Sequence, residues 1–118
     1  MTYAAFRSIG AYIPPKIMTN ADFEKIIDTS DEWITKRTGI KERRISEVDE
    51  ASSDLGSRAA EVAIQRAGIS KEEVDLVICA TVTPDYLCMP STACLIAAKV
   101  GLPPIMAFDI SAACTGFV

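Results

Sequence analysis

The feature that most constrains the fold is a largely apolar run over residues 74–83, which reads V-D-L-V-I-C-A-T-V-T. Continuous rather than alternating apolar residues are typical of a strand covered on both faces, as in a parallel sheet. A second short apolar strand is expected over Ile105–Ile110. Between the two, Ser91 opens the segment T-A-C-L-I-A-A-K-V, a pattern that indicates a buried helix closed by Gly101. This order of strand, helix and strand predicts an α/β layered architecture with a mostly parallel sheet.

Capping and turn residues divide the rest of the chain into further elements. We expect a strand over Ala4–Tyr12, a helix after an N-cap at Asn20, a helix between Ser30 and Gly39, a helix over Ser52–Ala67 ended by Gly68, and a short turn after Ser70. Asp85–Met89 is expected to be a loop. No repeat or linker divides the chain, so residues 1–118 are expected to belong to one layered domain.

Composition excludes several classes of protein. The chain has 118 residues, 49% of them hydrophobic, and a net charge of −4, which argues against a nucleic-acid-binding protein. Neither a secretory signal nor an apolar run long enough for a membrane helix is visible, and a cytoplasmic location is expected. Five of the twelve basic residues lie within Lys36–Arg44 and form a local positive patch.

The cysteines do not form a metal or disulfide pattern. The chain has four cysteines at irregular spacing and no histidine, so neither a structural zinc site nor a disulfide framework is expected. Cys79 in the apolar strand and Cys94 in the expected helix are interpreted as small core residues. Cys88 is a loop thiol to which the sequence assigns no role.

Cys114 differs from the other three because it follows a strand within the small-residue stretch S-A-A-C-T-G. Small neighbours suit a sharp strand-to-helix turn like the nucleophile elbow of other acyl-transfer folds. A helix beginning beyond Cys114 would point its free N–H groups at the sulfur and favour the thiolate. The N–H of Cys114 would be placed to donate to an oxyanion. A buried cysteine at a tight turn is the alternative interpretation.

The sequence stops where this last helix is expected to begin, and its final residues are the apolar G-F-V. We therefore expect the chain to be the front portion of a longer protein. A cysteine nucleophile usually works with a base such as histidine. Because the chain has no histidine, the partners of Cys114 are expected outside it.

Several motifs of this sequence occur together in one known family. The stretch D-T-S-D-E-W-I-T-K-R-T-G-I-K-E-R-R, Asp28–Arg44, resembles the signature of the β-ketoacyl-acyl-carrier-protein synthase III family. F-D-I-S-A-A-C-T-G-F, Phe108–Phe117, is similar to the cysteine motif shared across thiolase-like condensing enzymes. Thr19-Asn20 and Pro90-Ser91 match in order and spacing, so the resemblance covers the whole chain. It implies the N-terminal part of the first of two duplicated halves of a thiolase-like fold.

The resemblance also implies an activity, namely the first condensation of type II fatty-acid synthesis. An acyl group, commonly acetyl, would move from coenzyme A to a cysteine, and malonyl-acyl carrier protein would then lose carbon dioxide and attack the acyl-cysteine. The implied partners are acyl-CoA and malonyl-acyl carrier protein, with coenzyme A thioester as substrate and no permanently bound cofactor. A homodimer is implied as well, and neither nucleic acid nor membrane is an expected partner.

Residue by residue, the resemblance assigns five positions. Cys114 matches the acylated cysteine, and Trp33 and Arg37 match positions that sandwich the adenine of coenzyme A. Thr29 matches a nearby cofactor-contacting position. Met89 stands where many members have a phenylalanine that reaches into the partner's acyl pocket, and methionine is slimmer and more flexible. The alternative interpretations assign no binding role: Trp33 would pack in the core, Arg37 would be a solvated charge, and Met89 would be an ordinary residue of a dimer interface.

Two other functions stay open. One is a related condensing enzyme that takes another primer, such as a polyketide starter-unit synthase. The other is a non-catalytic half that only pairs with a partner chain. The family's histidine and asparagine are absent from this sequence, so the chain by itself is expected to be inactive. Three further basic residues would attract phosphates or an acidic carrier protein, or form an ordinary solvated face: Lys41, Arg43 and Arg44.

Overall fold

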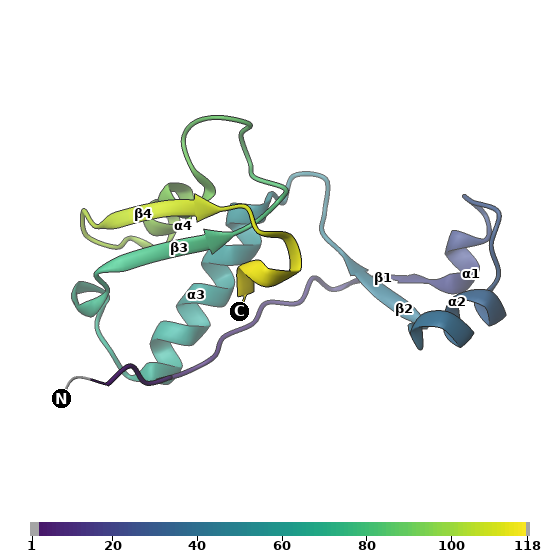
Figure 1. Ribbon diagram of the computed structural model, residues 1–118, viewed down its shortest axis with the longest axis horizontal. Coiled ribbons are helices and arrows are strands. Elements are labelled where there is room, and N and C mark those ends of the chain that lie inside the picture. Colours follow the sequence, from purple (N-terminus) through teal and green to yellow (C-terminus); the bar gives the residue numbers. More distant parts are fainter. Residues whose placement is uncertain (1–2, 118) are drawn as a thin grey trace. The chain divides into compact units, whose positions relative to one another are not determined.

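The computed structural model describes residues 3–117, which form two compact units (Figure 1). Unit 1 comprises Met1–Tyr12 and Glu50–Val118, and unit 2 comprises Ile13–Asp49. Val118, the last residue of the apolar ending discussed above, lies outside the described residues. None of the helices within residues 3–117 has the length and apolar character that crossing a bilayer requires. Each unit is described by itself, and the assignment of residues 1–118 to one domain stays a prediction.

Unit 1 is built on two parallel strands, β3 (Leu76–Ala80) and β4 (Met106–Ile110). Their register runs from Leu76 opposite Met106 to Ala80 opposite Ile110. Helix α4 (Thr92–Val100) links them, packs on both strands and also contacts α3 (Ser52–Ala67). The parallel pair and both helices confirm the α/β architecture that the apolar runs predict.

The helices of unit 1 end where the turn residues predict. Gly68 ends α3 and Gly101 ends α4, each with left-handed backbone. Ser91 caps α4 by accepting the N–H of Cys94 at 3.2 Å, and the expected short turn is the 3₁₀ helix η1 (Lys71–Glu73). The most deeply buried side chains lie where the two helices meet: Ala93, Ile96, Val100, Ser53, Ser57 and Thr92.

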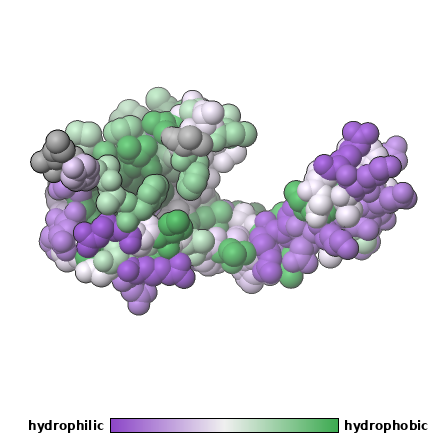
Figure 2. All heavy atoms as spheres, turned by 60° about the horizontal axis from the view of Figure 1, so that its bottom comes forward, coloured by the Kyte–Doolittle hydropathy of each residue, from purple (hydrophilic) through white to green (hydrophobic). Residues whose placement is uncertain are grey.

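The expectation that the apolar strand is covered on both faces is wrong for the described chain. Leu76 and Ile78 of β3 are 42% and 51% exposed, and Met106 and Phe108 beside them on β4 are exposed too. The reason is that α4 covers the opposite face, toward which Val77 and its alternating neighbours are turned. Figure 2 shows the resulting concentration of hydrophobic residues on unit 1.

The predicted first strand over Ala4–Tyr12 is also wrong, because this segment forms no ladder with the described strands. It lies along α3, where Ser8 Oγ donates to the Ala63 carbonyl at 2.6 Å and Arg66 donates to the Ile9 carbonyl at 2.9 Å. A Cβ atom on Gly10 would lie 2.3 Å from the carbonyl oxygen of Ala59. The small and polar residues of the segment thus fit a helix surface rather than a strand edge.

Unit 2 contains an antiparallel strand pair that the sequence patterns did not predict. The pair is β1 (Lys16–Thr19) and β2 (Glu42–Ile45), with Lys16 opposite Ile45. Two helices connect them, α1 (Asn20–Phe23) and α2 (Asp31–Thr38). Within residues 3–117 the strands thus form two separate pairs, a parallel one in unit 1 and an antiparallel one in unit 2.

The caps of unit 2 are partly as predicted. Ser30 caps α2 by accepting the N–H of Trp33 at 3.1 Å, and left-handed Gly39 ends it, as expected. The cap of α1 is Thr19 rather than Asn20, because the Thr19 hydroxyl accepts the N–H of Asp22 at 3.2 Å while the Asn20 side chain is engaged elsewhere.

Candidate functional site

The turn that carries Cys114 begins directly after β4. Ala113, the residue before the cysteine, has a φ of 45°, in the left-handed region that costs a non-glycine residue about 1–2 kcal/mol. Two bonds to the Ala112 carbonyl hold the turn, one from the Thr115 N–H at 3.0 Å and one from the Thr115 hydroxyl at 2.6 Å. A strained residue next to a candidate nucleophile is the pattern that the elbow interpretation predicts.

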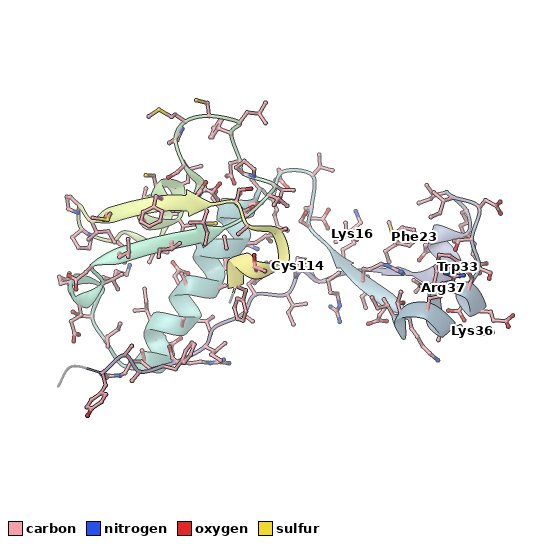
Figure 3. The ribbon with its side chains drawn as sticks, viewed as in Figure 1. Lys16, Phe23, Trp33, Lys36, Arg37 and Cys114 are labelled. Atoms are coloured by element: carbon pink, nitrogen blue, oxygen red, sulfur yellow. The ribbon has the colours of Figure 1, made fainter. Side chains whose placement is uncertain are left out.

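The thiol of Cys114 is exposed, which excludes the alternative of a cysteine buried at a tight turn (Figure 3). The expected helix beyond Cys114 is not formed within the described residues. Cys114 lies instead inside the short 3₁₀ helix η2 (Ala113–Phe117). Five residues align few peptide dipoles, so the structure gives the predicted helix-terminus activation of the thiol no support.

The other cysteines contrast with Cys114. Cys79 is half-buried in β3, and burial, followed by the negative charges of Asp109 and Asp85, raises the pKa of its thiol. Its thiolate is therefore disfavoured, in agreement with a structural role. Cys88 is exposed on its loop as expected, whereas the prediction that Cys94 is a core residue is wrong. Cys94 lies on the exposed side of α4, opposite the side that carries Ala93 and Ile96 into the core.

A cavity of about 520 Å³ opens at the carboxyl ends of β3 and β4, the edge from which the Cys114 turn leaves. Ligands of α/β proteins bind outside this edge of a parallel sheet. The lining combines the loop after β3 with the end of β4: Thr81, Val82, Pro84, Tyr86, Leu87, Cys88, Ser91, Asp109, Ile110 and Ser111.

Two aspartates that the sequence patterns did not single out fix this edge. The Asp109 carboxylate accepts the N–H groups of Thr92 and Ala93, both at 2.7 Å, and so ties the end of β4 to the start of α4. Asp85 accepts the N–H of Ser53 at 2.9 Å and its hydroxyl at 2.5 Å, which ties the loop to α3. An acidic residue at the end of an otherwise apolar strand is the signal that marks Asp109 in the sequence.

Met89 lies on the same loop as Asp85, is 81% exposed, and is joined to Pro90 by a cis peptide bond. This position agrees with the loop predicted from the sequence. Whether Met89 reaches an acyl pocket stays a prediction.

In unit 2, Trp33 and Arg37 lie four residues apart on α2 and therefore on one face of the helix (Figure 3). The guanidinium carbon of Arg37 lies 4.5 Å from the centroid of the indole ring. Trp33 is 54% exposed, so the alternative of a tryptophan packed in the core is wrong. The two side chains form an exposed cation–π pair.

This contact does not have the geometry of the predicted sandwich. A purine stacked between the two groups needs a separation of roughly 7 Å, twice the contact distance of about 3.5 Å between stacked atoms. At 4.5 Å, Arg37 would have to leave the ring before a base could enter. The arrangement instead holds the indole from one side.

Thr29 lies beside this indole. A hollow of about 510 Å³ is lined by the turn that precedes α2 and by Trp33: Ile27, Asp28, Thr29, Ser30 and Trp33. Thr29 and Trp33 thus line one hollow, and contact of Thr29 with coenzyme A stays a prediction. Cys114 belongs to unit 1 and this hollow to unit 2.

The chain was compared with family models, curated proteins and solved structures. No family model matches the chain. Among curated relatives, β-ketoacyl-[acyl-carrier-protein] synthase III of Aliarcobacter butzleri is 85% identical over 118 residues, which are 100% of this chain and 35% of the relative. The enzyme of the same name from a Sulfurovum strain is 67% identical over 116 residues, 98% of this chain and 34% of that protein. The chain thus spans about a third of the length of these relatives.

Solved structures agree. The 3-oxoacyl-[acyl-carrier-protein] synthase III of Aquifex aeolicus superimposes with a TM-score of 0.88 at 53% identity, over 93% of this chain and 35% of the other. The priming β-ketosynthase of a polyketide biosynthetic pathway gives a TM-score of 0.89 at 37% identity, over 95% and 33%. By sequence along its whole length and by its thiolase-like fold, the chain belongs to the β-ketoacyl-[acyl-carrier-protein] synthase III family of condensing enzymes.

Proposed function

We propose that the complete protein containing this chain is an acyltransferase that starts fatty-acid synthesis through an acyl group carried on Cys114. The observation that carries the proposal is the exposed thiol at a strained turn after β4, in a chain 85% identical to a synthase III. Cys79, whose pKa is raised by burial, is unsuited to the same role. Cys114 is therefore the thiol on which we place the chemistry.

Two steps follow from this placement. The Cys114 thiolate attacks the thioester carbonyl of acyl-CoA, the bond from that carbon to the coenzyme A sulfur breaks, and coenzyme A leaves as a thiol after taking up a proton. Malonyl-acyl carrier protein then loses carbon dioxide, and the electron pair of the broken carbon–carbon bond attacks the acyl carbon. The sulfur of Cys114 leaves, and a β-ketoacyl-carrier protein is released. The group that accepts the thiol proton is not a histidine of this chain, which contains none.

For the nucleotide end of acyl-CoA we propose the hollow of unit 2. The adenine would stack on the indole face of Trp33 that Arg37 does not cover, while Arg37 backs the ring. Thr29 supplies a hydroxyl within the same hollow. We further propose a homodimer in which Met89, exposed on its loop, reaches the acyl chain bound by the partner.

Intact mass spectrometry of the complete protein after incubation with acetyl-CoA tests the assignment. We expect one acetyl group per chain, lost in Cys114→Ala and retained in Cys94→Ala, a matched control because Cys94 is also exposed and does not line the cavity beside the Cys114 turn. An acetyl adduct that persists in Cys114→Ala would contradict the role of this cysteine. No adduct with acetyl-CoA or with longer acyl-CoA primers would contradict acyl transfer itself.

A second candidate is a condensing enzyme that takes a different primer. It is favoured by the TM-score of 0.89 to a priming β-ketosynthase of polyketide synthesis. Met89 is the residue of this chain through which acyl selection would differ, because its flexible side chain admits longer groups than a rigid ring. Initial rates with acyl-CoA thioesters of increasing length distinguish the two, since an acetyl-specific enzyme slows steeply as the chain grows.

A further inference from the structure

Asn20 is the most buried polar residue of unit 2, with 2% of its surface exposed. Its Nδ2 donates to the Asp31 carboxylate at 2.7 Å, to the Ile40 carbonyl at 2.9 Å and to the Thr35 hydroxyl at 3.4 Å. Its Oδ1 accepts from the Arg43 guanidinium at 2.5 Å. One amide thus reaches four partners, with the Thr35 hydroxyl sharing a hydrogen of Nδ2 at the longest distance.

These partners surround α2. Asp31 is the first residue of the helix, Thr35 lies one turn later, and Ile40 follows the end at Gly39. The backbone N–H of Asn20 donates in addition to the Lys41 carbonyl at 3.1 Å. The residue therefore holds the beginning, the middle and the exit of one helix from a single point.

The Arg43 guanidinium is itself held in place, because its carbon lies 4.4 Å from the centroid of the Phe23 ring. Arg43 belongs to β2 and Phe23 to α1. The Asn20 amide therefore connects α2 with β2, and Arg43 extends this connection to the Phe23 ring of α1.

The chemistry requires an asparagine. Its side chain offers two N–H donors and a carbonyl acceptor together. An aspartate would lose both donors and bring a second carboxylate to within hydrogen-bonding distance of Asp31. An apolar residue would leave the Ile40 carbonyl and the partly buried Arg43 guanidinium without this partner.

Trp33 and Arg37 project from the helix that Asn20 fixes, so the position of the amide determines where the indole stands. We propose that Asn20 is a positioning residue for the nucleotide end of acyl-CoA, acting through α2 on the Trp33 ring. This inference rests on the proposed function, since it assigns the Trp33 hollow to the nucleotide.

The test compares two thioesters in the complete protein. Acetyl-CoA carries the nucleotide, whereas acetyl-pantetheine carries the same acyl group without it. For Asn20→Asp we expect the ratio of kcat/KM for acetyl-CoA to kcat/KM for acetyl-pantetheine to fall about tenfold, because a displaced ring loses only the nucleotide contact. Thr38→Val is the matched control. It removes the two hydrogen bonds of the Thr38 hydroxyl, one donated to the Ile34 carbonyl and one accepted from the Ile40 N–H, neither of which involves the Asn20 amide, and the ratio should stay unchanged.

A reciprocal exchange provides a second variant. In Asn20→Asp combined with Asp31→Asn, residue 31 supplies the N–H and residue 20 the oxygen, so the bond between them is restored with its direction reversed. We expect this pair to recover part of the ratio lost in Asn20→Asp alone, together with part of the coenzyme A affinity measured by calorimetry.

Three outcomes overturn the inference: kcat/KM values in Asn20→Asp that are unchanged with both thioesters, an equal loss with both, or a protein that does not fold. In the last two cases Asn20 would act on the fold as a whole rather than on the nucleotide site. These outcomes differ from a failure of the proposed function, which shows as absence of acetylation in the unaltered protein.

Discussion

The two units of this molecule hold their parts together by different means. Unit 1 buries apolar side chains between α3, α4 and the parallel strands, with Ala93, Ile96 and Val100 at the centre. Unit 2, all of which is described, buries one apolar side chain, Ile34, and one polar residue, Asn20. Hydrophobic burial is strong but non-directional, whereas hydrogen bonds are individually modest and fix geometry.

This difference matches what each unit presents. Unit 1 carries the strained turn at Cys114. The packing of its apolar core has to offset the free-energy cost of that strained backbone. Unit 2 carries the exposed ring of Trp33 on a short helix. Its interactions have to fix the orientation of that helix more than they have to stabilise the unit. We infer that the stability of the chain and the orientation of Trp33 depend on separate sets of residues. Substitutions in one set should therefore leave the property governed by the other set unchanged.

The largest expected effect comes from one substitution, glycine to alanine, made in each unit. In Gly10→Ala the new Cβ would lie 2.3 Å from the Ala59 carbonyl oxygen and 2.5 Å from the Ala63 nitrogen, both backbone atoms of α3. We expect a loss of about 3 kcal/mol in the free energy of unfolding, the upper end for overpacking. Urea denaturation monitored by circular dichroism measures it.

Gly39→Ala is the matched variant in unit 2. Gly39 has a φ of 72°, but no heavy atom lies within 4 Å of the position that the new methyl group would take, so only the left-handed backbone opposes the change. The expected loss is about 1 kcal/mol. Equal losses in the two variants would break the distinction between a packed and a hydrogen-bonded unit.

The next effect concerns binding rather than stability. Trp33→Ala removes the ring on which we place the adenine, and stacking of a base on an aromatic side chain is worth about 1–3 kcal/mol. We expect coenzyme A affinity, measured by calorimetry, to fall roughly tenfold to a hundredfold. The urea midpoint should change little because the indole is half exposed. A large drop in stability with unchanged affinity would assign Trp33 to the fold instead.

Sequence patterns anticipated most of unit 1 because its elements are regular and apolar. Ser52–Ala67 is a helix with the bounds expected, and the strand–helix–strand order holds. The patterns failed at Ser53 and Ser57, which are more buried than the apolar residues of the same helix because small side chains allow the two helices to approach closely. Composition alone carries no signal for such contacts.

The candidate site was anticipated in part. The small-residue stretch around Cys114 and the motif around Trp33 both located residues that the structure leaves exposed. The stacking of Arg37 on Trp33 and the role of Asn20 were missed. Both depend on contacts set by tertiary structure, such as the bond from Asn20 to Ile40, twenty residues away along the chain.

A smaller expected effect is a difference in alkylation rate among the thiols of unit 1. Burial and two nearby aspartates raise the pKa of Cys79, so its thiolate is scarcer than that of an ordinary cysteine at neutral pH. Iodoacetamide should therefore alkylate Cys79 most slowly of the four, as measured by peptide mass mapping over time. Cys88 and Cys94, both exposed, are the internal controls. Rapid alkylation of Cys79 in the folded protein would contradict the structural role assigned to it.

The smallest expected effect concerns two helix-capping aspartates, Asp22 and Asp54, and the stability that each loses in acid. The Thr19 side chain, followed by Lys25, holds the pKa of Asp22 well below its usual range. The Lys99 ammonium at 2.6 Å, followed by the Ala51 N–H, lowers the pKa of Asp54. Because the unfolded chain binds protons first, at about pH 4, each group contributes stability that is present above that pH and lost as the pH falls further.

Replacing each aspartate in turn assigns this loss to a unit. Asp22→Asn should flatten the acid response of Trp33 fluorescence, which reports on unit 2, with Trp33→Phe as the blank. Asp54→Asn should flatten the response of the helical circular dichroism signal, because Asp54 lies in the first turn of α3, the longest helix described. Asp75→Asn, at an exposed aspartate, is the control. If either variant flattened both signals equally between about pH 5 and pH 2, the two units would unfold as one, since independent units respond only to their own carboxylates.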